Sequence, residues 1–208
     1  MTLVIAAVFS ISAQGQGFLN LNFESAYNLP ENPPFPNGEL VSATNGLPDW
    51  TAYAGDNALA EINYVSNDIS GSQTSVELEG GALALSGDFS VGLYDGGNIR
   101  QMGLVPAGAE SLKFEANAVL NFSVILGGQT LSYSALSEGP NYTVYGANIL
   151  AGMDGQMEML TFFNAGPGEG TVLDNIEFST PEPAEWAIIG VGALLLGFWR
   201  RRKRERFG

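Results

Sequence analysis

Ser75-Val-Glu-Leu-Glu79 alternates apolar and polar residues, and Phe18-Leu-Asn-Leu-Asn-Phe23 shows the same alternation. Because successive side chains of a strand point to opposite faces of its sheet, this period of two predicts half-buried β-strands. Glu77 and Glu79 are then expected on a solvent-facing side, opposite the apolar residues of their strand. Between the two ends of the chain, no window has the longer apolar period and the caps of a helix.

Further strands are expected along the chain from these two stretches. Turn-forming pairs such as Asn37-Gly38, Gly80-Gly81 and Gly127-Gly128 separate them, and the last pair predicts a hairpin. Short strands at intervals of about 8–12 residues are typical of a β-sandwich, so residues 17–179 are predicted to be all-β and jelly-roll-like. The proline-rich stretch 29–48 is expected to be an extended surface segment. The other expected strands are Ala60–Val65, Phe89–Tyr94, Ser111–Ala118, Asn121–Leu126, Gln129–Tyr133, Tyr142–Ile149, Glu158–Phe163 and Val172–Phe178.

Charge is distributed very unevenly along the sequence. Of the 8 lysines and arginines only Arg100 and Lys113 precede residue 181, whereas 19 of the 22 acidic residues do, so this part carries a formal charge of 2 − 19 = −17. Such a surface has no basic patch to displace counterions from phosphates, which excludes nucleic acid as an expected partner. The sequence has no cysteine and no histidine, which excludes cysteine nucleophiles, Ser-His-Asp triads and Cys/His zinc or haem sites.

The N-terminal stretch Met1–Ala13 is an apolar run of signal-peptide length. Ala13-Gln14-Gly15 offers the small-x-small pattern that signal peptidase accepts, and a polar Gln-Gly stretch follows. No lysine or arginine precedes Arg100, so either the α-amino group alone supplies the positive charge of this region or the true translation start lies upstream of Met1. Residues 1–15 are therefore predicted to form the helix of a signal peptide, and the alternative is a buried first strand.

The C-terminal end has three consecutive parts. Pro181-Glu182-Pro183 is followed by an uncharged run, 186–199, with a tryptophan at each end, Trp186 and Trp199. The run of about 14 residues spans roughly 21 Å as a helix, less than the roughly 30 Å of hydrocarbon in a bilayer. Interfacial tryptophans and snorkelling arginines extend it, which favours a transmembrane helix over 186–199 with the basic end in the cytoplasm. That basic end consists of Arg200, Arg201, Arg202, Lys203 and Arg204.

Together, these three parts resemble the PEP-CTERM sorting signal over residues 181–208. The resemblance implies recognition of the Pro181-Glu182-Pro183 motif by an exosortase, a membrane enzyme that processes its substrates nearby. It also implies export to the envelope or exterior of a Gram-negative type of cell and association with extracellular polysaccharide. C-terminal segments of this kind are also labelled as ice-binding protein C-terminal domains, a label that indicates nothing about the rest of the chain.

Residues 17–179 look like the galactose-binding-like jelly rolls that many carbohydrate-binding modules share. The similarity lies in Leu21-Asn-Phe-Glu24 near the start, Leu47-Pro-Asp-Trp50, and Leu173-Asp-Asn-Ile-Glu-Phe178 at the end. It implies that the first and last strands are neighbours and that a structural calcium ion lies between them, with Glu24 and Asp174 as ligands. Calcium binds several oxygen ligands, so an acidic exported domain without disulfides suits it.

Three functions remain open for this acidic domain. We expect a non-catalytic surface or matrix protein with a structural or polysaccharide-associated role, and the first alternative is a lectin-like carbohydrate-binding module. Sugar sites pair a flat aromatic side chain with polar groups, because a sugar has an apolar face and a ring of hydroxyls. Two sets offer this combination: Trp50, Tyr53 and Asp49, and Tyr94, Asp95 and Asn98.

The second alternative is a glycosidase, which needs only two carboxylates about 5–10 Å apart. Carboxylates are abundant in this sequence, and their spacing alone does not pair them. The candidates are Asp49, Asp56, Glu61, Asp68, Glu77, Glu79, Asp88, Asp95, Asp154 and Glu158.

Overall fold

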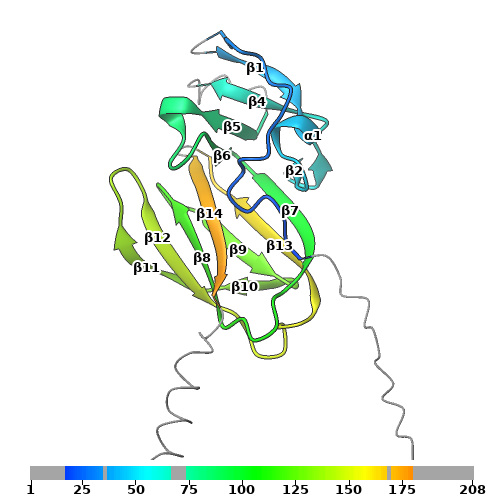
Figure 1. Ribbon diagram of the computed structural model, residues 1–208, viewed down its shortest axis with the longest axis vertical. Helices are drawn as coiled ribbons and strands as arrows, with labels where there is room; N and C mark the ends of the chain where they lie inside the picture. Colours follow the sequence, from blue (N-terminus) through cyan, green and yellow to red (C-terminus); the bar gives the residue numbers. More distant parts are fainter. Residues whose placement is uncertain (1–16, 35–36, 67–73, 168–169, 180–208) are drawn as a thin grey trace, which may run out of the picture.

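The computed structural model describes residues 17–34, 37–66, 74–167 and 170–179, and this part of the chain is built almost entirely of β-strands (Figure 1). A four-residue helix, α1 (Ala43–Gly46), and a short 3₁₀ turn, η1 (Gly81–Leu83), interrupt them. The strands are β1 (Asn37–Ser42), β2 (Thr51–Ala54), β3 (Asn57–Ala58), β4 (Glu61–Ser66), β5 (Val76–Gly80), β6 (Phe89–Leu93), β7 (Gly97–Leu104), β8 (Ser111–Ala116), β9 (Phe122–Leu126), β10 (Gln129–Leu131), β11 (Tyr133–Glu138), β12 (Thr143–Asn148), β13 (Met157–Asn164) and β14 (Thr171–Ser179).

These strands form two sheets with one core between them. The larger sheet has the order β1-β4-β5-β6-β14-β8-β12-β11, and the smaller has the order β10-β9-β13-β7-β2-β3. Among the described strands β4 and β5 pair in parallel, and the other ladders are antiparallel. The predicted all-β sandwich is therefore confirmed.

Alternate residues of facing strands build the core. On β8 and β9 every second side chain is buried, and Phe114 and Phe122 lie with their ring centroids 5.8 Å apart. Phe162 of β13 contacts both, at 5.8 Å and 6.0 Å. Each fully buried side chain of this size contributes about 1.5–3 kcal/mol, so this aromatic cluster fixes how the two sheets face each other.

Most of the predicted strands agree with the structure to within two residues. The stretch Ser75–Glu79 is confirmed as β5, and the expected strands from Ala60 onward correspond to β4, β6, β8, β9, β10, β12, β13 and β14. The predicted hairpin is confirmed between β9 and β10, where Gly127 and Gly128 have positive φ angles of 56° and 76°. Strands β1, β2, β3, β7 and β11 were not predicted.

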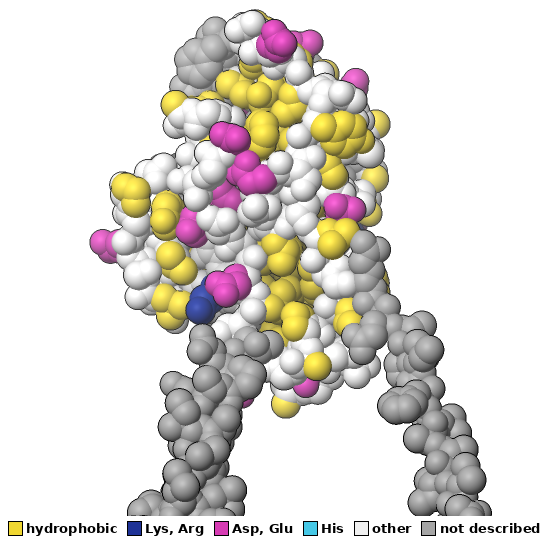
Figure 2. Space-filling model, viewed as in Figure 1, with side chains coloured by type: hydrophobic (Ala, Val, Ile, Leu, Met, Phe, Trp, Pro, Cys, Tyr) yellow, Lys and Arg dark blue, Asp and Glu magenta, His cyan; other side chains and the backbone are white. Residues whose placement is uncertain are grey.

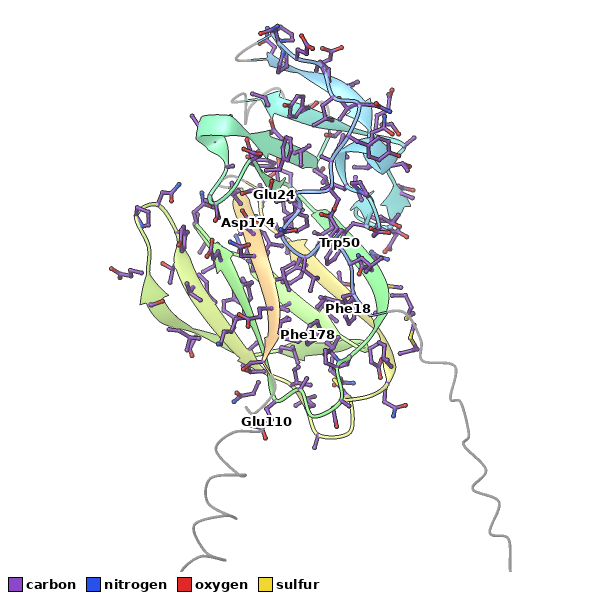
Figure 3. All side chains as sticks on the ribbon, in the orientation of Figure 1. Phe18, Glu24, Trp50, Glu110, Asp174 and Phe178 are labelled. Atoms are coloured by element: carbon purple, nitrogen blue, oxygen red, sulfur yellow. The ribbon has the colours of Figure 1, made fainter. Side chains whose placement is uncertain are left out.

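The strand predicted over Phe18–Phe23 is wrong. Asn20 and Phe23 have φ angles of 48° and 57°, which break the extended backbone that a strand requires. The segment still lies beside β14, because the backbone N–H of Ile176 donates to the carbonyl of Leu21 at 2.9 Å. The ring of Phe18 also stacks on Phe178 at 5.1 Å (Figure 3).

Two further expectations need correction. The proline-rich stretch 29–48 is not extended throughout, because it contains β1 and α1. The outer side of β5 is not solvent-facing, since Glu77 is 2% exposed and Glu79 is 3% exposed. Around Glu79 the cause is visible: the Tyr94 ring lies over Gly92 of the neighbouring strand, where an added Cβ would come within 2.8 Å of it.

The signal peptide predicted over 1–15 and the sorting tail predicted over 181–208, including the helix over 186–199, lie outside the described residues. Within the described ranges, no helix combines the length and the apolar character that crossing a membrane requires.

Candidate functional site

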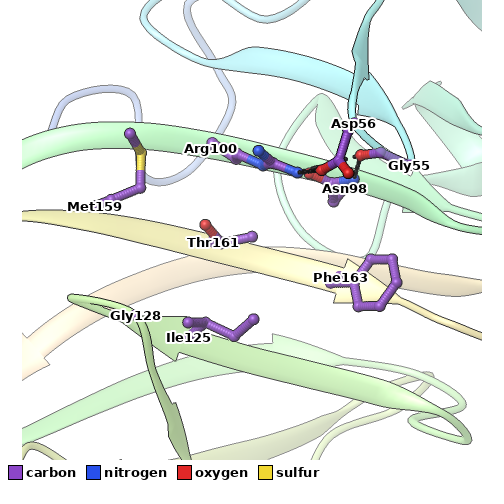
Figure 4. Close-up of a pocket in the computed structure, with 9 residues that line it drawn as sticks. All are labelled: Gly55, Asp56, Asn98, Arg100, Ile125, Gly128, Met159, Thr161 and Phe163. Atoms are coloured by element: carbon purple, nitrogen blue, oxygen red, sulfur yellow. Dashed lines mark hydrogen bonds and ion pairs between the residues drawn. The ribbon is translucent and has the colours of Figure 1, made fainter.

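A groove lies on the outer face of the smaller sheet, and β7 and β13 form its floor (Figure 4). The register places Arg100 opposite Thr161 and Asn98 opposite Phe163. Because directly paired residues of an antiparallel ladder point to the same side, these four side chains share one face. The intervening residues, such as Ile99, point into the core and are fully buried.

Two hairpin turns form the walls of the groove. Gly55 and Asp56 belong to the turn between β2 and β3, and Gly128 belongs to the turn between β9 and β10. Ile125 and Met159 complete the described lining, and the volume of the groove is about 480 Å³. This volume falls within the range of roughly 300–1,000 Å³ that is typical of small-molecule sites.

Arg100 is the most strongly oriented side chain in this groove. Its Nε donates to Asn98 Oδ1 at 2.7 Å, and its Nη2 donates to the Gly55 carbonyl at 3.2 Å and to Asp56 Oδ1 at 3.3 Å. The guanidinium also lies 4.2 Å from the centroid of the Tyr53 ring, a cation–π contact. These contacts hold a flat hydrogen-bond donor at the groove without burying it completely, since the side chain is 30% exposed.

The predicted sugar-binding residues lie in different places. Trp50 is 5% exposed, and its rings contact Phe23 and Phe162 inside the core. Tyr53 lies on the outer face of the smaller sheet against Arg100, at the groove. Tyr94 is 8% exposed, whereas Asp95 after it is exposed. Of the two predicted sets, the groove therefore contains Asn98 from one and has Tyr53 from the other beside it.

Tyr94 belongs to a buried polar cluster of the larger sheet. Its hydroxyl donates to Glu79 Oε1 at 2.9 Å, while Glu79 Oε2 has no hydrogen-bond partner among the described residues. Burial raises the pKa of Glu79 to about 7, an effect that the hydrogen bond from Tyr94 only partly offsets. Burial, followed by the charges of Glu79 and Glu77, raises the pKa of Tyr94. Near neutral pH Glu79 is therefore partly protonated, whereas a solvated glutamate is ionised.

The two predicted calcium ligands, Glu24 and Asp174, lie close to the start of β6, where Glu24 contacts the turn before the strand and Asp174 contacts the strand itself (Figure 3). Glu24 Oε1 accepts from the backbone N–H of Asp88 at 2.9 Å, and Asp174 Oδ2 accepts from the Ser90 hydroxyl at 2.7 Å. Burial raises the pKa of Asp174 to about 6. Both carboxylates thus bind the chain itself, and among the described residues no group of three or more acidic side chains could hold a metal ion.

The acidic surface of the larger sheet is separate from the groove. Figure 2 shows acidic side chains across the face on which β14, β8 and β12 lie in front, with dark blue only near its lower edge. Lys113 of β8 is paired there with Glu177 in the register of β14. The two basic residues of the predicted domain thus lie on opposite sheets, and only Arg100 lies at the groove.

The groove contains residues that had no assigned role in the sequence. Arg100, Met159, Thr161 and Phe163 line it, yet their positions depend on the pairing of β7 with β13. One signal was present in the sequence: Arg100 is one of only two basic residues before position 181. Asp56 is the sole carboxylate among the described lining residues, so a pair of acidic groups is not seen there.

The predicted sorting residues Pro181, Glu182 and Pro183 lie beyond the described ranges, as do the anchor residues from Trp186 to Arg204. No protein-family model matches the chain, and a comparison with curated proteins finds no match.

Proposed function

We propose that this chain is an exported, non-catalytic surface or matrix protein whose β-sandwich associates with extracellular polysaccharide through the groove of the smaller sheet. The observation that carries the proposal is the groove itself. It combines an apolar floor at Phe163 and Met159 with an oriented donor, Arg100, and an exposed acceptor, Asp56. Sugars are bound by this combination, because they present apolar C–H faces and hydroxyls on the same ring.

Two features of the sequence support the same class of function. The PEP-CTERM-like tail implies delivery to the cell surface, and the jelly-roll-like sandwich is the architecture of many carbohydrate-binding modules. A sheet-face groove with two turns as walls also suits a chain ligand, because it is open rather than enclosed. The proposal therefore includes that the chain is exported and that its β-sandwich is a jelly roll.

Binding is tested with the full-length chain, purified in detergent, by affinity electrophoresis through gels that contain single polysaccharides. We expect retardation by at least one polysaccharide and its loss in Arg100→Ala. The matched control is Lys113→Ala, which removes the other basic residue of the domain from the opposite sheet and should leave retardation unchanged. A chain that no polysaccharide retards would overturn the proposal, and release of reducing ends would point instead to the glycosidase alternative.

Delivery is tested separately by replacing Pro181, Glu182 and Pro183 with alanine. If an exosortase processes the chain, the wild-type protein should lose its basic end and leave the membrane fraction. The triple variant should keep that end and remain in the membrane fraction. Equal distribution and equal mass of the two proteins would contradict processing at this motif.

A further inference from the structure

We infer that the groove accepts a neutral polysaccharide, a chain of hexoses without carboxylate or sulfate groups, whose neighbouring hydroxyls bind Arg100 and Asp56. This inference rests on the proposed function and specifies its ligand. It follows from three observations: the free groups of the Arg100–Asp56 pair, the apolar side of the groove, and the charge of the surface around it.

The Arg100–Asp56 pair offers a donor and an acceptor side by side. Nε and Nη2 of Arg100 are engaged with the protein, whereas its Nη1 forms no hydrogen bond to any described residue. Asp56 uses Oδ1 for the ion pair, and its Oδ2 has no partner in the described structure. A hydroxyl both donates and accepts, so two adjacent hydroxyls of a sugar fit one free N–H and one free carboxylate oxygen.

The pair is also accessible and already oriented. The Asp56 side chain is 99% exposed, whereas Arg100 is held by Asn98 and by the Tyr53 ring. Asn98 is itself 1% exposed and donates through Nδ2 to the Gly55 carbonyl at 2.9 Å, which fixes the turn that carries Asp56. The donor therefore loses little conformational freedom when a ligand binds.

The rest of the groove is better suited to contact the face of a sugar ring than to bind a charged group of the ligand. Phe163 lies directly opposite Asn98 in the ladder, and Ile125 lies opposite Thr161 on the other side of β13 (Figure 4). Met159 completes this apolar strip and is 36% exposed. Aromatic and aliphatic side chains of this kind contact the C–H face of a hexose.

The surrounding charge decides between a neutral and an acidic chain. Arg100 is neutralised by Asp56 at 3.3 Å, and the sequence before residue 181 carries 19 acidic and two basic residues. A polyanionic chain would therefore approach a surface of its own sign, with no uncompensated cation at the groove to attract it. A neutral chain meets no such repulsion, which favours it as the ligand.

The test uses pairs of polysaccharides that differ only in charge. Dextran is compared with dextran sulfate, and polygalacturonate is compared with its carboxyl-reduced form, by affinity electrophoresis of the full-length chain. We expect every acidic member to bind at least tenfold more weakly than its neutral counterpart. Binding of the neutral members should change less than twofold between about 20 mM and 300 mM NaCl, because screening acts on charged ligands.

The variant Asp56→Asn should give results of opposite sign for the two ligand classes. Asp56→Asn removes a charged acceptor, so it should weaken binding of a neutral chain about fivefold, whereas it would strengthen binding of an acidic chain by removing a competing carboxylate. Asp154→Asn makes the same charge change in the exposed loop after β12 and serves as the control. Unchanged urea midpoints show that both variants fold.

The outcomes separate this inference from the proposed function. Preference for dextran sulfate or polygalacturonate, or stronger binding by Asp56→Asn, overturns the neutral ligand while leaving polysaccharide binding intact. Absence of binding to all four polymers and to the wider panel overturns the proposed function itself. Arg100→Lys keeps the charge but loses the planar donor and its stacking on Tyr53, so it should bind almost as weakly as Arg100→Ala.

Discussion

Trp50 anchors the N-terminal segment to the core. Its Nε1 donates to the carbonyl of Asn20 at 3.0 Å, and its ring lies 5.8 Å from Phe23 and 6.2 Å from Phe162. Trp50→Phe keeps an aromatic ring but removes the indole N–H, so the Asn20 carbonyl retains only the longer hydrogen bond from the Phe23 N–H at 3.3 Å, and the free energy of unfolding should fall by about 1–3 kcal/mol. Urea unfolding measures this cost, and polysaccharide binding of the folded variant should not change. Lost binding at unchanged stability would instead make Trp50 a ligand platform.

Glu79 makes stability depend on pH in a direction opposite to that of a salt-bridged carboxylate. Burial raises its pKa from 4.5 to about 7 in the folded state, so the folded state holds a proton that the unfolded state releases earlier. The stabilising effect of this proton is fully present below pH 4.5 and is lost as the pH rises to about 7. The expected loss is about 3 kcal/mol, because each pKa unit between 4.5 and about 7 corresponds to about 1.4 kcal/mol.

Glu79→Gln tests this dependence. Glutamine is uncharged and can still accept the Tyr94 hydrogen bond, so the variant should exceed the wild type in stability at pH 8 and match it more closely at pH 5. Urea unfolding at both pH values measures the difference. Asp174, with a pKa raised to about 6, remains in both proteins, so some dependence on pH persists. Glu138→Gln, at an exposed position of β11, is the control, and an equal pH response of the wild type and Glu79→Gln would contradict the prediction.

The N-terminal segment shows why alternation predicts some strands and not others. Its sequence alternates as regularly as β5, but an alternating pattern specifies only which side chains are apolar. A strand also requires an unbroken extended backbone, and Asn20 and Phe23 leave it. Conversely, β7 and β11 were missed because their glycine, serine and polar residues obscure the period, although partner strands supply their hydrogen bonds. Burial of Glu79 was equally unpredictable, since it depends on the ring of Tyr94, which follows the neighbouring strand β6.

Gln101 of β7 holds this segment by hydrogen bonds that replace a strand ladder. Its Oε1 accepts from the backbone N–H of Leu19 at 2.7 Å, and its Nε2 donates to the carbonyls of Leu19 and Asp49, both at 3.0 Å. Gln101→Ala should therefore release the segment locally and accelerate amide hydrogen exchange at Leu19 at least tenfold. Met102→Ala, at the 53% exposed neighbour, is the control. Unchanged exchange in Gln101→Ala would mean that the other contacts of the segment, such as the Phe18–Phe178 stacking and the Ile176–Leu21 hydrogen bond, suffice to hold it.

The groove joins residues that are far apart in the sequence, and this limits what the sequence could predict. Its described lining runs from Gly55 to Phe163 and draws on β7, β9, β13 and two turns. The sequence showed which residue types were present, and it made Tyr53 and Asn98 candidates for sugar binding and Asp56 a candidate carboxylate. It did not show that residues of the groove lie together, because that depends on the order of strands in the smaller sheet, which no local pattern encodes. The sorting tail predicted over 181–208 has the opposite character, since the three parts of its sequence pattern are contiguous and the prediction required no fold.

The charge of the domain should make its stability rise with salt. Nineteen acidic and two basic residues precede position 181, and Arg100–Asp56 is the one ion pair in the described structure, so repulsion exceeds attraction. Raising NaCl from about 20 mM to 300 mM shortens the screening length from roughly 20 Å to about 6 Å and should raise the free energy of unfolding by about 1–2 kcal/mol. Urea unfolding of the full-length chain measures this gain.

CaCl₂ and MgCl₂ at equal ionic strength separate screening from a specific metal site, since screening alone gives coincident unfolding curves. A larger gain with calcium would indicate a site, with Glu24 and Asp174 the first residues to replace, and a loss of stability in NaCl would contradict the dominance of repulsion.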